Sequence, residues 1–212
     1  MSEAATHRDP GPDRAGTDLT ASRLSLAARC PGAFVLPHFG RETPEATRGT
    51  AIHAHVARLL EDGLWEPERE EDPEARAVLL RMGPAELRAS CAFEGVSSLR
   101  AEVPFALDPS SGTARLLPPA SGGHRDYSSA PAGSVCGTAD AVAAGDGRVL
   151  VTDFKTGSFP VAPPETNPQL AFLALAAARA YGAPEAVARI VRVDPEGRLL
   201  ASTAEFSPTS SR

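Results

Sequence analysis

Two apolar segments, residues 135–144 and 148–155, are separated only by Gly-Asp-Gly, and this arrangement constrains the fold more than any other part of the chain. Glycine and aspartate between two apolar runs favour a tight turn, so the segments are predicted to pair as neighbouring antiparallel strands. Asp140 lies within the first strand, and Asp153 and Lys155 lie at the end of the second. The hairpin therefore brings two carboxylates and one amine to a small sheet.

The rest of the chain predicts a mixed α/β domain, with a small central sheet flanked by helices and a helical segment near the N-terminus. Helices are expected where apolar residues recur at helical spacing, over 20–30, 45–63, 73–92 and 167–182. Gly83-Pro84 is expected to kink or split the third of these. Further strands are expected over 99–108, 185–193 and 198–206, the last two as a hairpin.

A chain of 212 residues with 42% hydrophobic residues is long enough for one domain with a substantial core. We assign that domain to residues 19–206, with a Ser-, Gly- and Pro-rich loop insertion over 108–134. Residues 1–18 are rich in proline, glycine and charge, and are expected to be a disordered tail. Residues 207–212 are expected to be a short C-terminal tail.

Composition also narrows the environment and the partners. No run of about 18 apolar residues occurs, so no membrane span is expected. The polar N-terminus lacks the apolar stretch of a secretory signal, and the three cysteines form no CxxC pair, which together favour reduced thiols in a cytoplasmic protein. The net charge of −6 argues against a wholly basic nucleic-acid-binding surface but leaves a local basic groove open.

Whether Asp140 and Asp153 can bind one metal ion depends on the register of the hairpin. Side chains alternate along a strand, so Asp153 shares a face with Val151. Asp140 joins that face if it pairs with Val151, which a two-residue turn at 145–146 or a four-residue loop over 144–147 would produce. The two carboxylates would then be diagonal neighbours, with backbones roughly 7–8 Å apart, near enough to bind one Mg²⁺ or Mn²⁺ ion.

Lys155 is the only lysine in a chain whose lysine and arginine residues number 21. An ammonium is a compact point charge, so it can steady a phosphate or orient an attacking water in a way that the broad guanidinium of arginine cannot. A metal ion beside it would polarise a phosphoryl oxygen and activate water. Asp-x-Lys-Thr-Gly is also an ordinary exit from a strand into a turn, so this segment alone leaves both interpretations open.

Five segments resemble the PD-(D/E)XK nuclease superfamily in their order and spacing. They are RGTAIH (48–53), AEVPF (101–105), GTADAV (137–142), VTDFKTG (151–157) and NPQLAFLALAA (167–177). The resemblance covers about residues 19–206 and is closest to the RecB-like branch, which includes CRISPR-associated exonucleases and helicase-fused recombination nucleases. It implies a restriction-endonuclease-like core that hydrolyses DNA phosphodiesters with a divalent metal.

The resemblance also implies roles for the residues that match its motifs. Asp140 and Asp153 would be metal ligands at the catalytic centre, and Lys155 would be the catalytic lysine. His53 would join the metal site from its helix. Glu102, on the preceding strand, would be a ligand or a water-positioning group.

Contacts with nucleic acid are less well defined. Gln169 matches a glutamine that approaches the nucleic acid from the helix behind the site, but Leu173 stands where that branch often has tyrosine. Arg48 could contact a phosphate or be an ordinary surface charge. No cysteine follows Cys136, so the iron–sulfur centre of many CRISPR-associated members is not expected here.

Several alternatives stay open on the residues alone. His53 and His55 lie at opposite edges of the apolar stripe of their helix, and only the Arg-Gly-x-x-x-His match favours His53. Glu102 lies opposite the apolar side of its strand, where a solvated charge is equally consistent. The acidic run over 66–76 is expected to be a solvated helix start and a poor place for DNA.

The leading hypothesis is a Mg²⁺- or Mn²⁺-dependent deoxyribonuclease of exonuclease type, acting in DNA repair, recombination or defence. Its expected substrates are single-stranded DNA or duplex ends, which a helicase or another DNA-processing subunit could deliver. One alternative is a non-catalytic nuclease-fold subunit that binds DNA or acts as a scaffold, against which the presence of Asp140, Asp153 and Lys155 together argues. Another is a metal-dependent hydrolase of smaller phosphoesters.

Overall fold

The structure, a computed structural model, describes residues 20–30, 43–119, 126–156, 160–194 and 196–207. The predicted N-terminal tail and all but Ser207 of the predicted C-terminal tail lie outside these ranges. None of the described helices is long and apolar enough to cross a lipid bilayer.

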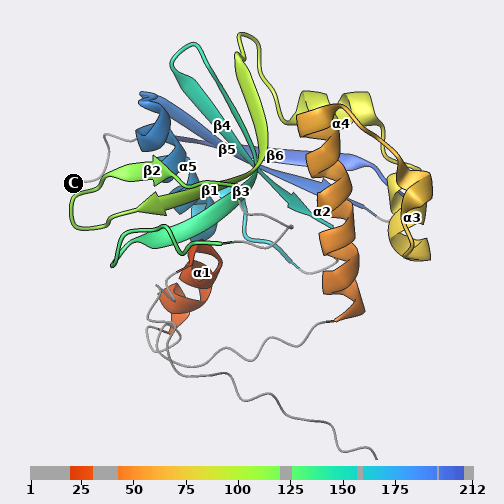
Figure 1. Cartoon of the computed structure of the whole chain (residues 1–212), viewed down its shortest axis with the longest axis horizontal. Helices are drawn as coiled ribbons and strands as arrows, with labels where there is room; N and C mark the ends of the chain where they lie inside the picture. Colours follow the sequence, from red (N-terminus) through yellow and green to blue (C-terminus); the bar gives the residue numbers. More distant parts are fainter. Residues whose placement is uncertain (1–19, 31–42, 120–125, 157–159, 195, 208–212) are drawn as a thin grey trace, which may run out of the picture.

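A six-stranded sheet with the order β2-β1-β3-β4-β5-β6 lies at the centre of the domain (Figure 1). Its strands are β1 (Ser98–Leu107), β2 (Ala114–Leu116), β3 (Val135–Gly145), β4 (Arg148–Lys155), β5 (Glu185–Val193) and β6 (Leu199–Phe206). β4 and β5 are parallel and every other neighbouring pair is antiparallel. The predicted mixed sheet is therefore confirmed.

Helices cover both faces of this sheet. They are α1 (Ala21–Arg29), α2 (Pro44–Asp62), α3 (Pro73–Leu79), α4 (Pro84–Ser90) and α5 (Pro168–Tyr181), with short 3-10 turns η2 (Pro67–Arg69) and η4 (Pro164–Thr166). Buried residues of α1 and α5 pack on one face, and those of α2, α3 and α4 pack on the other. The result is a three-layer α/β domain whose sheet is the shared core.

Most element boundaries follow local signals in the sequence. α2 ends at Gly63 and α5 at Gly182, both in the left-handed conformation that glycine adopts without strain. The carboxamide oxygen of Asn167 caps α5 by accepting hydrogen bonds from two backbone amides of the first turn. The helix expected over 73–92 is split into α3 and α4 at Gly83-Pro84, as the sequence predicted.

The loop insertion predicted over 108–134 contains one strand that the sequence did not predict. Residues 114–116 form the edge strand β2, which pairs with residues 105–107 of β1. Three residues are too few to show the alternating pattern of a strand, so the sequence alone does not reveal β2. Only its hydrogen bonds with β1 identify it as a strand.

The turn between β3 and β4 also differs from both predicted turns. Gly145 pairs with Arg148, which leaves Asp146 and Gly147 as the two central residues. Their φ values of 48° and 72° are those of a type I′ turn, for which Asp-Gly is a favoured sequence. The register thus differs by two residues from the one in which Asp140 pairs with Val151. Asp140 lies directly opposite Asp153 rather than diagonal to it. Both aspartates are one residue beyond the last pair of the ladder.

Strand β1 exchanges faces where it passes the end of this ladder. Ala101 packs in the core cluster of α2, whereas Val103 packs in the cluster of α5, although side chains two apart normally share a face. Glu102 between them has a φ of 45°, which is uncommon for a residue other than glycine. The paired residues of β3 make the same exchange on either side of Asp140.

Gly137 of β3 is required by the close approach of two helices. A Cβ atom at this position would lie 2.7 Å from the Cβ of Ala21 in α1, and 3.0 and 3.1 Å from side-chain atoms of Phe172 and Leu173 in α5. This crowding explains the glycine of the Gly-x-x-Asp segment, because any side chain there would push α1 and α5 away from the strand that carries Asp140.

We expect Gly137→Ala to lower the free energy of unfolding by about 1–3 kcal/mol, because an extra methyl group overfills a packed interior. Urea unfolding measures the change. Gly83→Ala is the matched control, because Gly83 has a φ of −83° and its added Cβ would meet neighbours only at 3.6 Å. Equal stability of the Gly137→Ala protein and the wild type would contradict this account of the packing.

Candidate active site

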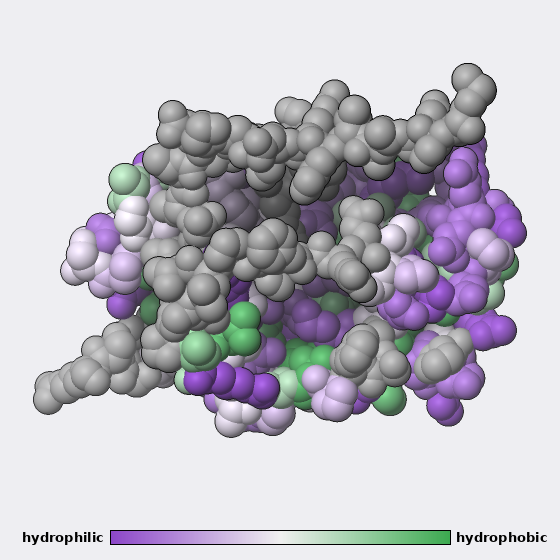
Figure 2. Space-filling model, turned by 90° about the horizontal axis from the view of Figure 1, so that it is seen from below, coloured by the Kyte–Doolittle hydropathy of each residue, from purple (hydrophilic) through white to green (hydrophobic). Residues whose placement is uncertain are grey.

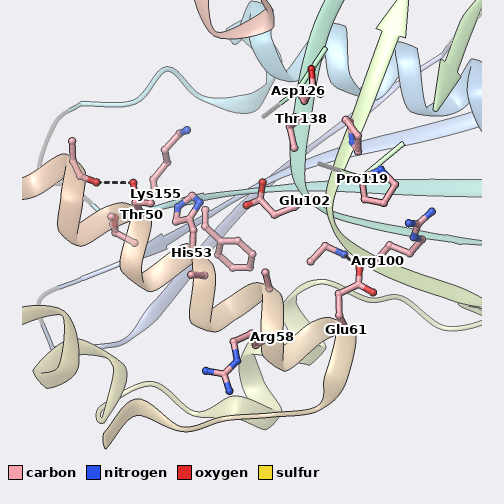
Figure 3. Close-up of a pocket in the computed structure, with 18 of the residues that line it drawn as sticks. Thr50, His53, Arg58, Glu61, Arg100, Glu102, Pro119, Asp126, Thr138 and Lys155 are labelled. Atoms are coloured by element: carbon pink, nitrogen blue, oxygen red, sulfur yellow. Dashed lines mark hydrogen bonds between the residues drawn. The ribbon is translucent and has the colours of Figure 1, made fainter. Parts of the chain in front are cut away.

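An open cavity of about 1080 Å³ lies between α2 and strands β1, β3 and β4 (Figure 3). One wall consists of α2 residues at helical spacing, among them Thr50, His53 and Arg58. Glu102 of β1 and Lys155 of β4 point into the same space from the sheet. The cavity therefore collects side chains from segments that are far apart in the sequence.

Gly49 allows α2 to approach the end of β4. A Cβ atom at this position would lie 3.1 Å from the hydroxyl oxygen of Thr156, which directly follows Lys155. The glycine of the Arg-Gly-x-x-x-His segment thus has a packing role, and one helical turn further along α2 this packing brings His53 over the sheet.

His53, Glu102 and Asp140 form a group that can bind a metal ion. One ligand atom from each residue lies within 4.8 Å of the other two. His53 Nδ1 is 3.4 Å from Asp140 Oδ1, and Asp140 Oδ2 accepts a hydrogen bond of 2.7 Å from the backbone amide of Phe154. Asp140 is only 6% exposed, and its carboxylate is held by His53 on one oxygen and by the Phe154 amide on the other.

Asp153 lies beside this group and is paired with Lys155. The Lys155 ammonium donates a hydrogen bond of 2.9 Å to Asp153 Oδ1 and lies 2.7 Å from Oδ2. Oδ2 is nevertheless buried and, among the described residues, no group is aligned to donate a hydrogen bond to it. Oδ2 is thus paired with the ammonium by charge but accepts no aligned hydrogen bond, and a buried carboxylate of this kind fits a site where a metal cation completes the coordination.

The donor set of this site fits a divalent cation. Carboxylate oxygens suit Mg²⁺ and Mn²⁺, and one imidazole nitrogen is compatible with a transition metal such as Mn²⁺. The sequence predicted Asp153 as a metal ligand, whereas the three-residue group contains Glu102 instead. Asp153 lies beside this group on β4, opposite Asp140. The metal-ligand roles of these four residues stay predictions.

Burial and, after it, the neighbouring charge of Asp140 raise the pKa of Asp153 to about 6, although Lys155 acts in the other direction. The carboxyl is only 4% exposed, so water cannot stabilise its charge. In the absence of a metal ion, Asp153 is therefore the more easily protonated of the two buried aspartates.

His53 and Asp140 shift in the directions of an ion pair. Burial tends to lower the pKa of His53, but the Asp140 carboxylate more than offsets it, so the pKa of His53 is raised. Burial tends to raise the pKa of Asp140, but His53 and the Phe154 amide outweigh it, so the pKa of Asp140 is lowered. Asp140 is thus the more acidic of the two buried aspartates.

The structure also distinguishes the two histidines of α2. His53 faces the cavity, whereas His55 is 7% exposed and its Nε2 lies 3.2 Å from a carboxylate oxygen of Glu70. The ring of His55 packs edge-on against Trp65. His55 therefore has a packing role on the side of α2 away from the site.

The two predicted nucleic-acid contacts lie outside the cavity wall. Arg48 forms an ion pair with Glu74 of α3, and Gln169 lies in the first turn of α5 on the other face of the sheet. Their roles in binding stay predictions without a place in the described cavity.

Some residues that shape the site were not predicted from the sequence. Glu61, near the end of α2, accepts a 2.6 Å hydrogen bond from the backbone amide of Ala101, which ties the helix to β1 beside Glu102. Thr138 of β3 lines the cavity and is hydrogen-bonded to Tyr127 at 2.9 Å. No sequence pattern indicates these contacts, because they join residues whose proximity depends on the complete fold.

A family model described as the PD-(D/E)XK nuclease superfamily matches residues 18–209 of the chain. The mixed sheet flanked by helices agrees with the restriction-endonuclease-like fold of that superfamily. No curated protein matches the chain. The match does not separate the RecB-like branch from other branches, so that branch stays a prediction.

The raised pKa of Asp153 makes a prediction about stability in EDTA. A carboxyl whose pKa rises on folding contributes stability below its ordinary value of 3.8 and loses it as the pH rises through about 6. Asn does not ionise, so Asp153→Asn avoids this loss, and the stability of the variant relative to the wild type should rise from about pH 4 to pH 7.

Urea unfolding in EDTA at several pH values measures this difference. Asp62→Asn, at an exposed position in the last turn of α2, is the control and should show no such gain. A stability difference between Asp153→Asn and the wild type that does not vary with pH would contradict the assigned environment of Asp153.

Proposed function

Because the chain belongs to the PD-(D/E)XK nuclease superfamily, we propose that it is a deoxyribonuclease that depends on Mg²⁺ or Mn²⁺. Nucleases of this superfamily generally use divalent metals, and a nuclease fold implies DNA as the substrate. The observation that carries the proposal is the group of His53, Glu102 and Asp140, whose ligand atoms lie within 4.8 Å of one another beside a buried Asp153–Lys155 pair.

In this proposal His53, Glu102 and Asp140 hold the metal ion, and Asp153 Oδ2 supplies a further donor. When bound, the ion polarises a phosphoryl oxygen and lowers the pKa of a coordinated water. The Phe154 amide keeps Asp140 oriented through its 2.7 Å hydrogen bond, so the ligand does not have to be ordered when metal and substrate arrive.

Lys155 has two tasks in the proposed reaction. Its side chain is 30% exposed and is held by Asp153, so the ammonium faces the cavity in a defined position. There it stabilises the negative charge that develops on the phosphoryl oxygens and orients the attacking water. Glu102, on the opposite side of His53, is placed to accept a hydrogen bond from that water.

We further propose an exonuclease-type activity on single-stranded DNA or duplex ends, in DNA repair, recombination or defence. The support for this is the resemblance of the five sequence segments to the RecB-like branch. The net charge of −6 provides little general attraction for DNA, which is consistent with delivery by a helicase or another DNA-processing subunit.

We expect Asp153→Asn and Lys155→Ala to lower the cleavage rate by about 100-fold or more, because each removes a charge from the reacting centre. Lys155→Arg should also be impaired, because a guanidinium does not reproduce the compact charge of an ammonium. A 5′-labelled oligonucleotide assay with Mg²⁺ or Mn²⁺, and with EDTA as the blank, measures the rates.

Asp62→Asn serves as the control for Asp153→Asn, because it is the same change at an exposed position. Cleavage by Asp153→Asn or Lys155→Ala at the wild-type rate would refute the site. Binding of DNA by a wild-type protein that never cleaves it would instead favour the non-catalytic alternative.

A further inference from the structure

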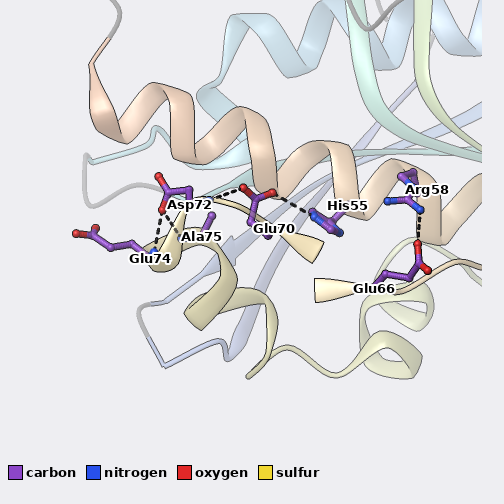
Figure 4. Close-up of polar contacts among 7 residues, drawn as sticks. All are labelled: His55, Arg58, Glu66, Glu70, Asp72, Glu74 and Ala75. Atoms are coloured by element: carbon purple, nitrogen blue, oxygen red, sulfur yellow. Dashed lines mark hydrogen bonds and ion pairs between the residues drawn. The ribbon is translucent and has the colours of Figure 1, made fainter. Parts of the chain in front are cut away.

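An acidic segment, residues 66–74, pairs with α2 at three places, and Figure 4 draws two of these pairs, Glu70 with His55 and Glu66 with Arg58. Glu66 pairs with Arg58, Glu70 with His55 and Glu74 with Arg48, so the segment runs antiparallel to the helix. Glu74, 68% exposed in the first turn of α3, is the solvated helix start that was expected, whereas Glu70, 15% exposed, is not simply solvated. On the face drawn in Figure 2, hydrophilic residues gather at the end of the molecule that carries α3.

Of the three α2 residues in these pairs, only Arg58 also lines the cavity. It lies at the edge of the helical face that carries His53, and its guanidinium turns away toward Glu66 (Figures 3 and 4). Arg58 Nη2 is 2.6 Å from Glu66 Oε2, and the two side chains are 41% and 29% exposed. An ion pair this exposed contributes about 0–1 kcal/mol, so another anion can replace Glu66 at little cost.

Arg58 is suitably placed to meet a neighbouring phosphate. It follows His53 by five residues, which is about 7.5 Å along the helix axis and about 140° around it, so its long side chain has to swing back from Glu66 to reach the cavity. That distance along the axis is comparable to the spacing of successive phosphates in an extended strand. Lys155 lies beside Thr50, on the other side of His53, so Arg58 occupies the far side of the proposed metal group.

The charges at this end of the cavity also favour a phosphate. Arg100 of β1 lines the same end and is exposed. The acidic residue there, Glu61, already has its Oε1 engaged by the backbone amide of Ala101. With Arg58 turned inward, a phosphate at this end can pair with two guanidinium groups, although the lining as a whole carries four acidic residues (Glu45, Glu61, Glu102 and Asp126) against Arg58, Arg100 and Lys155.

We propose that Arg58 binds the backbone phosphate adjacent to the scissile one, exchanging Glu66 for that phosphate when a strand enters the cavity. This rests on the proposed function, because the scissile position is defined by the proposed metal group. It makes the enzyme selective for strands that continue beyond the cut on the Arg58 side, and disfavours small phosphoesters, which lack a second phosphate.

The test compares Arg58→Gln with Arg69→Gln in binding of 5′-fluorescein-labelled dT12, measured by anisotropy in EDTA so that no cleavage occurs. Both arginines pair with Glu66 and both changes remove one positive charge, but Arg69 is 73% exposed and lies outside the cavity wall. We expect Arg58→Gln to raise Kd about tenfold. The slope of log affinity against log salt should fall by about 0.7. Arg69→Gln should leave both unchanged.

The Glu66→Gln variant tests whether Arg58 binds DNA or only stabilises the fold through its ion pair with Glu66. It breaks the same ion pair but leaves Arg58 free, so the proposal predicts binding of dT12 at least as tight as that of the wild type. If Glu66→Gln and Arg58→Gln weaken binding equally, or if Arg58→Gln behaves like Arg69→Gln, the proposal is wrong. Failure of the wild-type protein to bind dT12 would also overturn it.

A parallel cleavage assay with Mg²⁺ or Mn²⁺ separates this inference from the proposed function. A difference in dT12 binding between Arg58→Gln and Arg69→Gln, in a wild-type protein that does not cleave DNA, would support the phosphate subsite and count against hydrolysis. Cleavage by the wild type together with equal binding by the two variants would count against the subsite alone.

Discussion

The site depends on placing three carboxylates side by side across adjacent strands of one sheet. The neighbours of Glu102 in β1 pair with the neighbours of Asp140 in β3, so these two acids lie side by side. Asp140 in turn lies opposite Asp153 of β4. Two of these acids are only 6% and 4% exposed, which makes their charges costly. His53, Lys155 and the Phe154 amide offset part of this cost, yet burial and the charge of Asp140 still raise the pKa of Asp153 to about 6. The remaining demand for positive charge is what the proposed divalent cation would meet.

Irregular backbone, rather than regular strand geometry, gives the carboxylates their positions. At Glu102 and Asp140 the two strands exchange faces, and the ladder between β3 and β4 ends one residue before Asp140 and Asp153. The Phe154 amide then pairs with the Asp140 carboxylate. Two glycines support this arrangement from opposite faces of the sheet, Gly137 by admitting α1 and α5 and Gly49 by admitting α2. The strain at Glu102, with its φ of 45°, is concentrated where the site is built.

Local signals predicted most of the elements but not the way they join. Glycine caps, the Gly83-Pro84 break and the apolar runs define helices and strands without reference to distant residues. The hairpin register was missed because Gly-Asp-Gly permits several turns, and the preference of a type I′ turn for Asp-Gly at 146–147 decided it. The choice of His53 over His55, the edge strand β2 and the pairing of Glu66 with Arg58 all depend on long-range packing that periodicity does not encode.

The most direct test of the account is anomalous diffraction from crystals soaked in Mn²⁺ at neutral pH. The account predicts a manganese peak bounded by the side chains of His53, Glu102 and Asp140, with Asp153 within reach of the same ion. A peak elsewhere on the protein with none in this group, or no peak at a concentration that supports cleavage, would contradict it.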